Sequence, residues 1–357
     1  MDDMKVRNFS KTTRSNLITY GMVIVAYIIV EIFLRAGMVS SLIEGLLVPL
    51  CVYVILAVSL NLTVGISGEL SLGHAGFMCV GAFAGATFSK CVEEVITFGP
   101  LRFLLALLIG TLCAALFGIL VGIPVLRLKG DYLAIVTLAF GEIIKNVVNV
   151  IYLGRDSRGF HVSIKDTISL GLEDEGEVII KGAQGITGTP NDSTFLWGII
   201  LILITLFIVI NLINSRTGRA IMAIRDNRIA AESVGVSVTK YKLLAFSVSA
   251  ALAGTAGVLY AHNLSTLTAL PKNFGYNMSI TILVFVVLGG IGNIRGSVIA
   301  AVVLTLLPEL LRGLNDYRML IYAIILIATM IFTSSPGGQE IQERIKLFFE
   351  RRKTKEA

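Results

Sequence analysis

The sequence predicts an all-α protein, a polytopic transmembrane helical bundle of about ten spans. Of the 357 residues, 55% are hydrophobic and 15% are charged, whereas a soluble chain has about 25% charged residues. The mean hydropathy is +0.83. The apolar residues also come in runs of about 20, which is the length that crosses a bilayer as a helix. Because lipid offers the backbone no hydrogen bonds, such runs satisfy their own N–H and C=O groups by forming helices.

Six segments are strongly apolar, and each is predicted to cross the membrane once: 17–35, 45–64, 101–123, 195–213, 242–262 and 319–333. Three further segments contain more small or polar residues: 69–88, 132–153 and 278–313. The last is too long for one crossing and is interrupted by Gly289, Gly290 and Arg295, so it is predicted as two short helices. The alternative is eight spans, if 69–88 is re-entrant or the 278–313 pair does not cross.

The charged residues orient this bundle. With ten spans, the basic N-terminal segment 1–16, the polar loop 214–241 and the basic tail 335–357 lie on one side of the membrane, and the acidic loop 154–194 lies on the other. Basic loops are kept on the cytoplasmic side. Both termini are therefore predicted to be cytoplasmic, 154–194 to be external, and 17–334 to form the transmembrane domain. The first apolar run has no small-residue cleavage site and is interpreted as a retained span.

The stretch from Asn214 to Lys242 is a basic island between two apolar spans, with six Arg or Lys residues against two acidic ones. Its apolar residues recur near helical spacing: Ile221, Ile224, Ile229 and Val234. The next residue, Gly235, is a typical helix stop. The pattern predicts a short amphipathic helix. Three uses are open for it: lying on the lipid surface, packing on its own bundle, or docking a soluble partner.

The segment Gly65–Ala86 carries glycines at spacings of three and four residues. One interpretation is close helix packing, and the other is a pathway-lining or unwound segment. Gly73 and His74 lie within it, and His74 is either a hydrogen-bonded structural residue or a ligand. A second glycine-rich break, 288–296, is either a short cytoplasmic turn or the counterpart of the first break in a duplicated transporter.

Glu142 and Lys145 are ionisable residues inside a predicted span, and their i, i+3 spacing places them on one helix face. Such residues are costly in a membrane unless they are paired or wet. We therefore expect the two side chains to interact with each other or with a polar cavity. They either line a substrate pathway or form an internal ion pair that sets helix packing. With Gly73 and His74, they are the candidate pathway residues.

Several classes of function find no support in the residues. The chain has no HExxH, no Gly-x-Ser-x-Gly and no phosphate-binding Gly-x-x-x-x-Gly-Lys-Ser/Thr loop, so it is predicted not to be an enzyme and not to hydrolyse ATP. The four cysteines lack CxxC spacing and are interpreted as small core residues. The net charge of +6 does not indicate nucleic-acid binding, because the basic residues cluster at loops and tails.

Five segments, in this order, resemble the LivM family, the permease subunits of branched-chain amino acid ABC transporters. They are SLGHAGFMCVGAFAG (71–85), LRLKGDYLAIVTLAFGEIIKNVVN (126–149), GAQGITGTP (182–190), TGRAIMAIRDNRIAAESVGVSVTKYKLLAFSVSAALAGTAGVLYAH (217–262) and VLGGIGNIRGSVIAA (287–301). Each segment alone is a weak match, but the ordered combination is specific. The stretch 156–181 carries less of the family pattern.

The resemblance implies a type II ABC importer-like permease in a bacterial inner membrane, surrounded by lipid and paired with a LivH-like second permease. It further implies an extracytoplasmic substrate-binding protein and two cytoplasmic ATPase subunits that bind ATP and Mg²⁺, so that this chain itself holds no cofactor. Of the three uses that are open for the polar loop, the resemblance implies the third, docking of a soluble partner, here an ATPase subunit. It places the ATPase-coupling contact at five residues: Arg219, Arg225, Asp226, Glu232 and Gly235.

The substrate implied by the resemblance is a branched-chain amino acid. Urea or a short-chain amide is the alternative, because selection in such importers rests largely with the binding protein. An ion-coupled secondary transporter is the competing class. It needs carboxylates near the membrane centre, and only Glu142 fits that requirement well.

Overall fold

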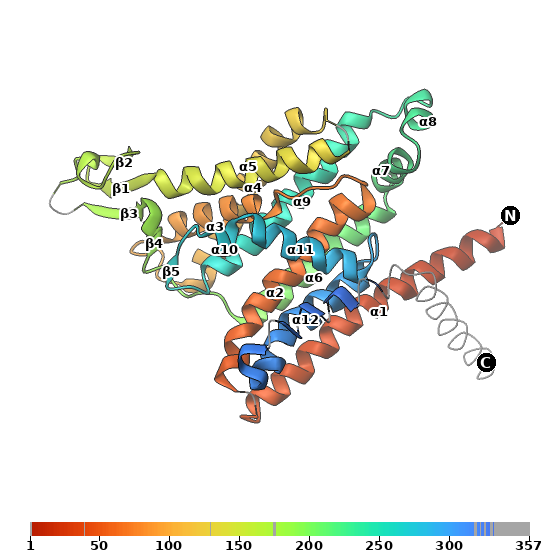
Figure 1. Ribbon diagram of the computed structural model, residues 1–357, viewed down its shortest axis with the longest axis horizontal. Helices are drawn as coiled ribbons and strands as arrows, with labels where there is room; N and C mark the ends of the chain where they lie inside the picture. The colour runs from red at the N-terminus through yellow and green to blue at the C-terminus, as the bar shows by residue number, and fades with distance from the viewer. Residues whose placement is uncertain are drawn as a thin grey trace.

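The computed structural model describes residues 2–317 except 39, 129, 174 and 175, together with some residues between 320 and 331. The chain folds as a helical bundle (Figure 1). Its helices are α1 (Asp2–Arg35), α2 (Ser41–Asn61), α3 (His74–Cys91), α4 (Gly99–Val125), α5 (Asp131–Val150), α6 (Phe195–Asn214), α7 (Arg216–Asp226), α8 (Arg228–Ser233), α9 (Val238–Ala261), α10 (Pro271–Phe274), α11 (Tyr276–Gly289) and α12 (Ile294–Leu310). A π-helical turn, η1 (Leu62–Ile66), extends α2.

Among the described residues, eight helical segments are long and apolar enough to cross a membrane: Asn16–Arg35, Ser41–Ile66, Gly99–Val125, Asp131–Val150, Phe195–Asn214, Val238–Ala261, Pro271–Gly289 and Ile294–Gly313. Each corresponds to a predicted span, and the split of 278–313 into two helices is confirmed. The predicted span 69–88 is not among these eight segments. The helix found there, α3, begins only at His74 and has 18 residues. The predicted tenth span, 319–333, lies largely outside the described residues.

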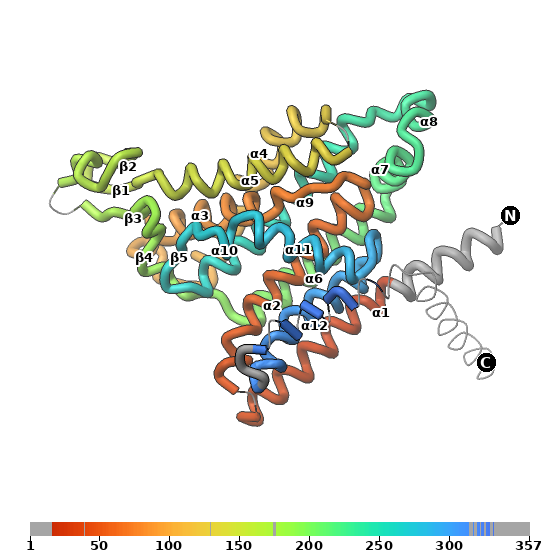
Figure 2. The backbone as a smooth tube through the Cα atoms, in the orientation of Figure 1, coloured from red at the N-terminus to blue at the C-terminus, as the bar shows by residue number. Residues whose placement is uncertain are grey.

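Helix α3 packs against α4 and α9, and the three run side by side through the middle of the bundle (Figure 2). Glycines set the spacing between them. A Cβ atom on Gly81 would lie 2.4 Å from the Cα of Gly254, and one on Gly257 would lie 2.1 Å from the carbonyl oxygen of Met78. No side chain fits at these crossings, so the backbones touch directly. Close packing is therefore confirmed for the helical part of the glycine-rich segment.

Between α5 and α6 the chain forms a small antiparallel sheet, which the sequence reading did not include. Strands β1 (Tyr152–Asp156), β2 (Gly159–Ser163) and β3 (Glu177–Lys181) are arranged in the order β2-β1-β3. A two-residue turn joins β1 to β2, and Asp156 Oδ1 accepts the Arg158 N–H there at 2.8 Å. Burial raises the pKa of the Asp156 carboxyl, but hydrogen bonds from Arg158 and His161 outweigh it and hold that pKa below its ordinary value.

The small strands β4 (Ile186–Thr187) and β5 (Thr266–Leu267) pair near this sheet, whereas α7 and α8 lie at the opposite end of the bundle (Figure 1). We call the end with β1–β3 the sheet end and the end with α7 and α8 the loop end. The two polar loops that the charge pattern assigned to opposite sides, 154–194 and 214–241, are thus at opposite ends of the molecule.

Candidate functional site

The loop between α6 and α9 folds into two short helices. Ser215 begins α7, since its Oγ accepts a hydrogen bond from the Gly218 N–H at 3.1 Å. Asn227 separates the helices: its backbone is extended (φ −153) and its Oδ1 accepts the Ala230 N–H at 3.0 Å, which caps α8. Both residues are typical N-caps, because a short polar side chain satisfies an otherwise unpaired N–H of the first turn.

The apolar residues of this loop do not share one buried face. Ile221 and Ile224 on α7 are only 1% and 3% exposed, whereas Ile229 on α8 and Val234 at its end are 80% and 77% exposed. The prediction of one amphipathic helix is therefore wrong, because the helix breaks at Asn227. After the break, α8 buries Ala231 but leaves Ile229 exposed. As a result, α7 packs on the bundle and α8 presents two apolar side chains outward.

All five predicted coupling residues are exposed on this loop: Arg219, Arg225, Asp226, Glu232 and Gly235. Glu232 forms an ion pair with Arg228 on α8, with 3.0 Å between Arg228 Nε and Glu232 Oε1. Gly235 has φ +84, in the left-handed region that favours glycine, and follows the end of α8 as predicted. Contact of these residues with an ATPase stays a prediction.

One of the five coupling residues, Arg225, points back toward the bundle. Its Nη1 donates to the carbonyl oxygen of Gly65 at 2.9 Å, and its Nε and Nη2 donate to Asp226 at 3.1 and 2.9 Å. Gly68 lies against the same side chain, since a Cβ there would be 2.6 Å from the Arg225 Cγ. No local pattern in the sequence indicates this contact, which joins residues 160 positions apart.

The contacted segment is a break in the helical chain. The π-helical turn η1 ends at Ile66, and residues 67–73 are not helical. π-Helical turns are rare and occur frequently at functional sites. Side chains of neighbouring helices satisfy the freed backbone: Thr137 Oγ1 accepts the Leu72 N–H at 3.0 Å, and Ser279 Oγ accepts the Ala75 N–H at 3.1 Å. The unwound interpretation is therefore confirmed for 67–73, beside the close packing of α3.

Gly73 and His74 lie at the start of α3, where they are packed tightly. A Cβ on Gly73 would be 2.3 Å from the carbonyl oxygen of Thr137. The His74 side chain is buried, and its Nε2 lies 2.7 Å from Ser59 Oγ. This geometry is that of a hydrogen-bonded structural histidine. The substrate-pathway role of these two residues stays a prediction.

The second glycine-rich break, 288–296, is a turn that joins α11 to α12. Gly290 and Gly292 adopt φ values of +92 and +82. The turn rests on the first break: Asn61 Oδ1 accepts the Gly292 N–H at 2.8 Å, and Asn61 Nδ2 donates to Ser297 Oγ at 2.8 Å. The two breaks, more than two hundred residues apart in sequence, are thus in contact beside α7.

Glu142 and Lys145 form an ion pair on α5, which confirms that they interact with each other. The Lys145 side chain is 7% exposed and that of Glu142 is 26% exposed. Glu142 Oε1 also accepts the Tyr276 N–H at 2.7 Å, at the N-terminus of α11. A carboxylate is stabilised there by the helix dipole. The pair therefore joins α5 to α11, while its exposure to a substrate path stays a prediction.

Glu142→Gln is expected to lower both the folded yield and the unfolding temperature. Removing one partner of a buried pair costs about 3–5 kcal/mol, because the other charge is left uncompensated. Glu142 is partly exposed, so the lower end of that range applies. Thermal unfolding in detergent measures the effect, with exposed Glu44 of α2 as the matched control. Equal unfolding temperatures for Glu142→Gln and Glu44→Gln would contradict a supporting role for the pair.

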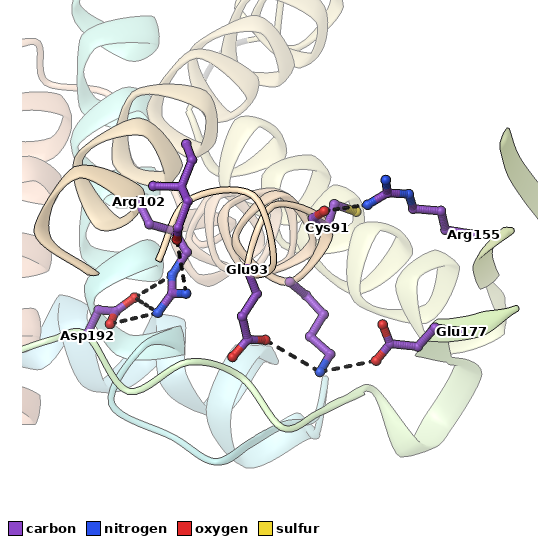
Figure 3. Close-up of polar contacts among 8 residues, drawn as sticks. Cys91, Glu93, Arg102, Arg155, Glu177 and Asp192 are labelled. Atoms are coloured by element: carbon purple, nitrogen blue, oxygen red, sulfur yellow. Dashed lines mark hydrogen bonds and ion pairs between the residues drawn. The ribbon is translucent and has the colours of Figure 1, made fainter. Parts of the chain in front are cut away.

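At the sheet end, a set of ion pairs joins segments that are distant in sequence (Figure 3). Arg102 on α4 is buried and holds Asp192, just before α6, with two hydrogen bonds of 2.9 and 3.0 Å. Lys90 on α3 lies between Glu93 at 3.6 Å and Glu177 of β3 at 3.2 Å. The Arg102 pair is bidentate, the stronger geometry for a guanidinium and a carboxylate. The Lys90–Glu177 pair joins β3 to the end of α3, and the Arg102–Asp192 pair joins the start of α4 to the segment before α6.

Among the residues that the structure describes, no group of three or more His, Cys, Asp or Glu side chains is arranged to hold a metal ion. The polar features of the molecule are instead hydrogen-bonded joints between helices. At the loop end, α8 and the residue that follows it present the exposed apolar side chains of Ile229 and Val234.

Comparison with known proteins gives a consistent result. Residues 42–330 match the family model described as "Branched-chain amino acid transport system / permease component". The chain is 36% identical over 291 residues to the high-affinity branched-chain amino acid transport system permease protein LivM of Salmonella typhimurium and to that of Escherichia coli, covering 79% of this chain and 66% of each relative. It therefore spans slightly less than two thirds of the length of these relatives.

The chain is also similar to relatives of lower identity. The probable LivM of Methanocaldococcus jannaschii is 24% identical, and the match covers 72% of this chain and 77% of that protein. The fructose import permease protein FruG of Bifidobacterium longum is 26% identical, and the match covers 81% of this chain and 79% of that protein. No solved structure matches the chain. The family match covers most of the helical bundle, including both glycine-rich breaks and the loop with α7 and α8, and it places this multi-pass membrane protein in the family of branched-chain amino acid transport system permease components.

Proposed function

We propose that this chain is a permease subunit of an ATP-driven importer for branched-chain amino acids in a bacterial inner membrane. It would form the path with a LivH-like second permease, receive substrate from an extracytoplasmic binding protein, and be driven by two cytoplasmic ATPase subunits that hold ATP and Mg²⁺. The observation that carries this proposal is α8, an exposed helix with Ile229 and Val234 facing outward at the loop end. An apolar anchor of this kind is typical of a helix seated in a partner's groove.

The energetic argument supports the same role. The sequence has no phosphate-binding loop, so free energy from ATP hydrolysis must enter through a protein contact. A helix in a groove transmits rigid-body motion, because packed interfaces shift between discrete arrangements. Arg228 and Glu232 flank the apolar side chains of α8 and supply a polar rim. The coupling contact is accordingly assigned to α8 and its flanks, with Arg219, Asp226, Glu232 and Gly235 exposed there.

The substrate class rests on the relatives. Three of them are named for branched-chain amino acid transport, while others are named for fructose and ribose import. A urea or short-chain amide importer is the second candidate within the same architecture. The selection is assigned to the binding protein, because the buried residues of the described bundle are mostly apolar.

Reconstitution tests the proposed function. The chain is assembled in liposomes with its second permease, ATPase subunits and binding protein, and uptake of labelled leucine, urea and acetamide is measured. Leucine uptake that depends on ATP and on the ATPase subunits is expected. Uptake by the purified chain alone, driven by a proton or sodium gradient, would instead identify a secondary transporter, and uptake of urea alone would select the second candidate.

The orientation is tested by labelling single cysteines in a background that lacks the four native ones. Ser157, at the turn between β1 and β2, and Ser233, at the end of α8, are both exposed. Because the acidic loop is predicted to be external and the basic loop cytoplasmic, Ser157→Cys is expected to react with an impermeant maleimide in intact cells. Ser233→Cys is expected to react only after permeabilisation. Labelling of both from the same side would contradict the orientation.

A further inference from the structure

Two side chains of the loop end hold the break in the helical chain, residues 62–73. Arg225 at the end of α7 donates to the carbonyl oxygen of Gly65 at 2.9 Å. Lys242 in the first turns of α9 forms an ion pair with Glu69, and the two side chains are 14% and 12% exposed. In the sequence, Arg225 precedes α8 and Lys242 follows it, and the two side chains meet the break within five residues of each other. The break is therefore fastened to the loop at two points.

The break is also attached to the rest of the bundle on its other side. At its beginning, Asn61 holds the α11–α12 turn through Gly292. At its end, Leu72 donates to Thr137 of α5, the helix that carries the Glu142–Lys145 pair. A displacement of residues 65–69 thus reaches α3, α5 and α11 through direct hydrogen bonds, without passing through the apolar core.

The local conformation makes this segment the deformable element among rigid helices. Residues 67–73 lack the helical hydrogen-bond ladder, and Gly68 has φ +73. Elements of this kind absorb backbone changes that a continuous helix resists. The Glu69–Lys242 pair is shielded from solvent, so it is weakened little by salt. The Arg225 side chain is 37% exposed, but the Gly65 carbonyl that it contacts belongs to a buried residue.

We propose that the Glu69–Lys242 ion pair and the Arg225–Gly65 hydrogen bond form a transmission joint. The joint carries movement of the α7–α8 loop to the broken segment 62–73 and from there to α3 and α5. This inference rests on the proposed function and goes further, because it assigns a positioning role to residues that do not contact the ATPase. Arg225 then acts inward on Gly65, while α8 and its flanks meet the partner.

Charge reversal tests the joint in the assembled importer. Glu69→Lys and Lys242→Glu each place like charges together, and the double variant restores an ion pair with its sign reversed. Three quantities are measured for each: the amount of ATPase that co-purifies, the rate of ATP hydrolysis, and the substrate taken up per ATP hydrolysed. For each single variant, uptake per ATP is expected to fall about tenfold, within the range of coupling energies for contacting residues. Binding of the ATPase subunits is expected to stay as in the wild type.

Restoration by the double variant separates a specific joint from general damage. Uptake per ATP is expected to return to within about threefold of wild type, because interacting residues are not additive. Glu69→Gln removes the charge without reversing it and provides the same comparison if a reversed single variant does not insert. Glu31→Lys is the matched control, since Glu31 pairs with Arg35 on α1 at 3.0 Å, away from the joint. Its uptake per ATP is expected to equal that of wild type.

The outcomes distinguish the joint from the function on which it rests. Fully coupled uptake in both single variants, or no recovery in the double variant, contradicts the joint alone. Loss of ATPase binding in parallel with loss of uptake also contradicts it, because residues 69 and 242 would then serve docking. A wild-type chain that binds no ATPase subunits contradicts the proposed function itself, and the joint with it.

Discussion

Gly257→Val is expected to prevent the chain from accumulating as a folded protein. A Cβ atom at Gly257 on α9 would lie 2.1 Å from the carbonyl oxygen of Met78 and 2.9 Å from the amide nitrogen of Ala82, both on α3. Both are backbone atoms of a helix, so no side chain can rotate away. The two helices must separate, and with them the packing of the bundle's centre. Overpacking a core costs typically about 1–3 kcal/mol, and a backbone clash places this variant at or above the upper end.

The measurement is the monodisperse fraction on size-exclusion chromatography, followed by thermal unfolding of whatever is recovered. Gly45→Val on α2 is the matched control, because no heavy atom lies within 4 Å of a Cβ at that position. It is expected to behave as the wild type. Recovery of Gly257→Val with a wild-type unfolding temperature would show that α3 and α9 are not packed through this glycine.

Ile229→Asp is expected to release the ATPase subunits while leaving the chain folded in the membrane. Ile229 is 80% exposed on α8, so its replacement removes no packing within this chain. In a partner's groove, the same change buries a charge where an apolar anchor was. Anchors of this kind contribute about 2 kcal/mol or more to binding, which corresponds to a loss of affinity of roughly thirtyfold.

Co-purification of the ATPase subunits with the tagged chain measures this effect. Val162→Asp is the control, because Val162 is also a highly exposed apolar residue, 66% exposed, but lies on β2 at the sheet end. It is expected to keep its ATPase subunits. If Ile229→Asp retains them as well, the docking surface lies elsewhere on the loop end.

The spans could be predicted from local composition because the bilayer acts on each segment separately. A run of about 20 apolar residues has one way to satisfy its backbone in lipid, whatever its neighbours are. The pairing of Glu142 with Lys145 was predictable for a related reason. The two residues lie one helical turn apart on α5, so helix geometry alone brings them together.

The division of the polar loop was missed although a signal was present. Asn227 is followed three residues later by Ala230, whose N–H it caps, and asparagine is among the best N-cap residues. The apolar spacing across Ile224 and Ile229 favours one continuous helix and so conflicts with this capping signal. The sheet between α5 and α6 was missed because β1 and β3 pair across more than twenty intervening residues, and the individual strands are short.

By itself, the sequence determined the helical membrane class, most of the spans and the family, because hydrophobic runs and ordered motifs act locally. Only the tertiary structure decided which residues meet: Arg225 with Gly65, Lys242 with Glu69, Asn61 with Gly292, and Arg102 with Asp192. These pairs are separated by 90 to 231 positions. Such contacts depend on how rigid helices pack through their glycines, and helix packing follows from the shape of whole surfaces rather than from any local pattern.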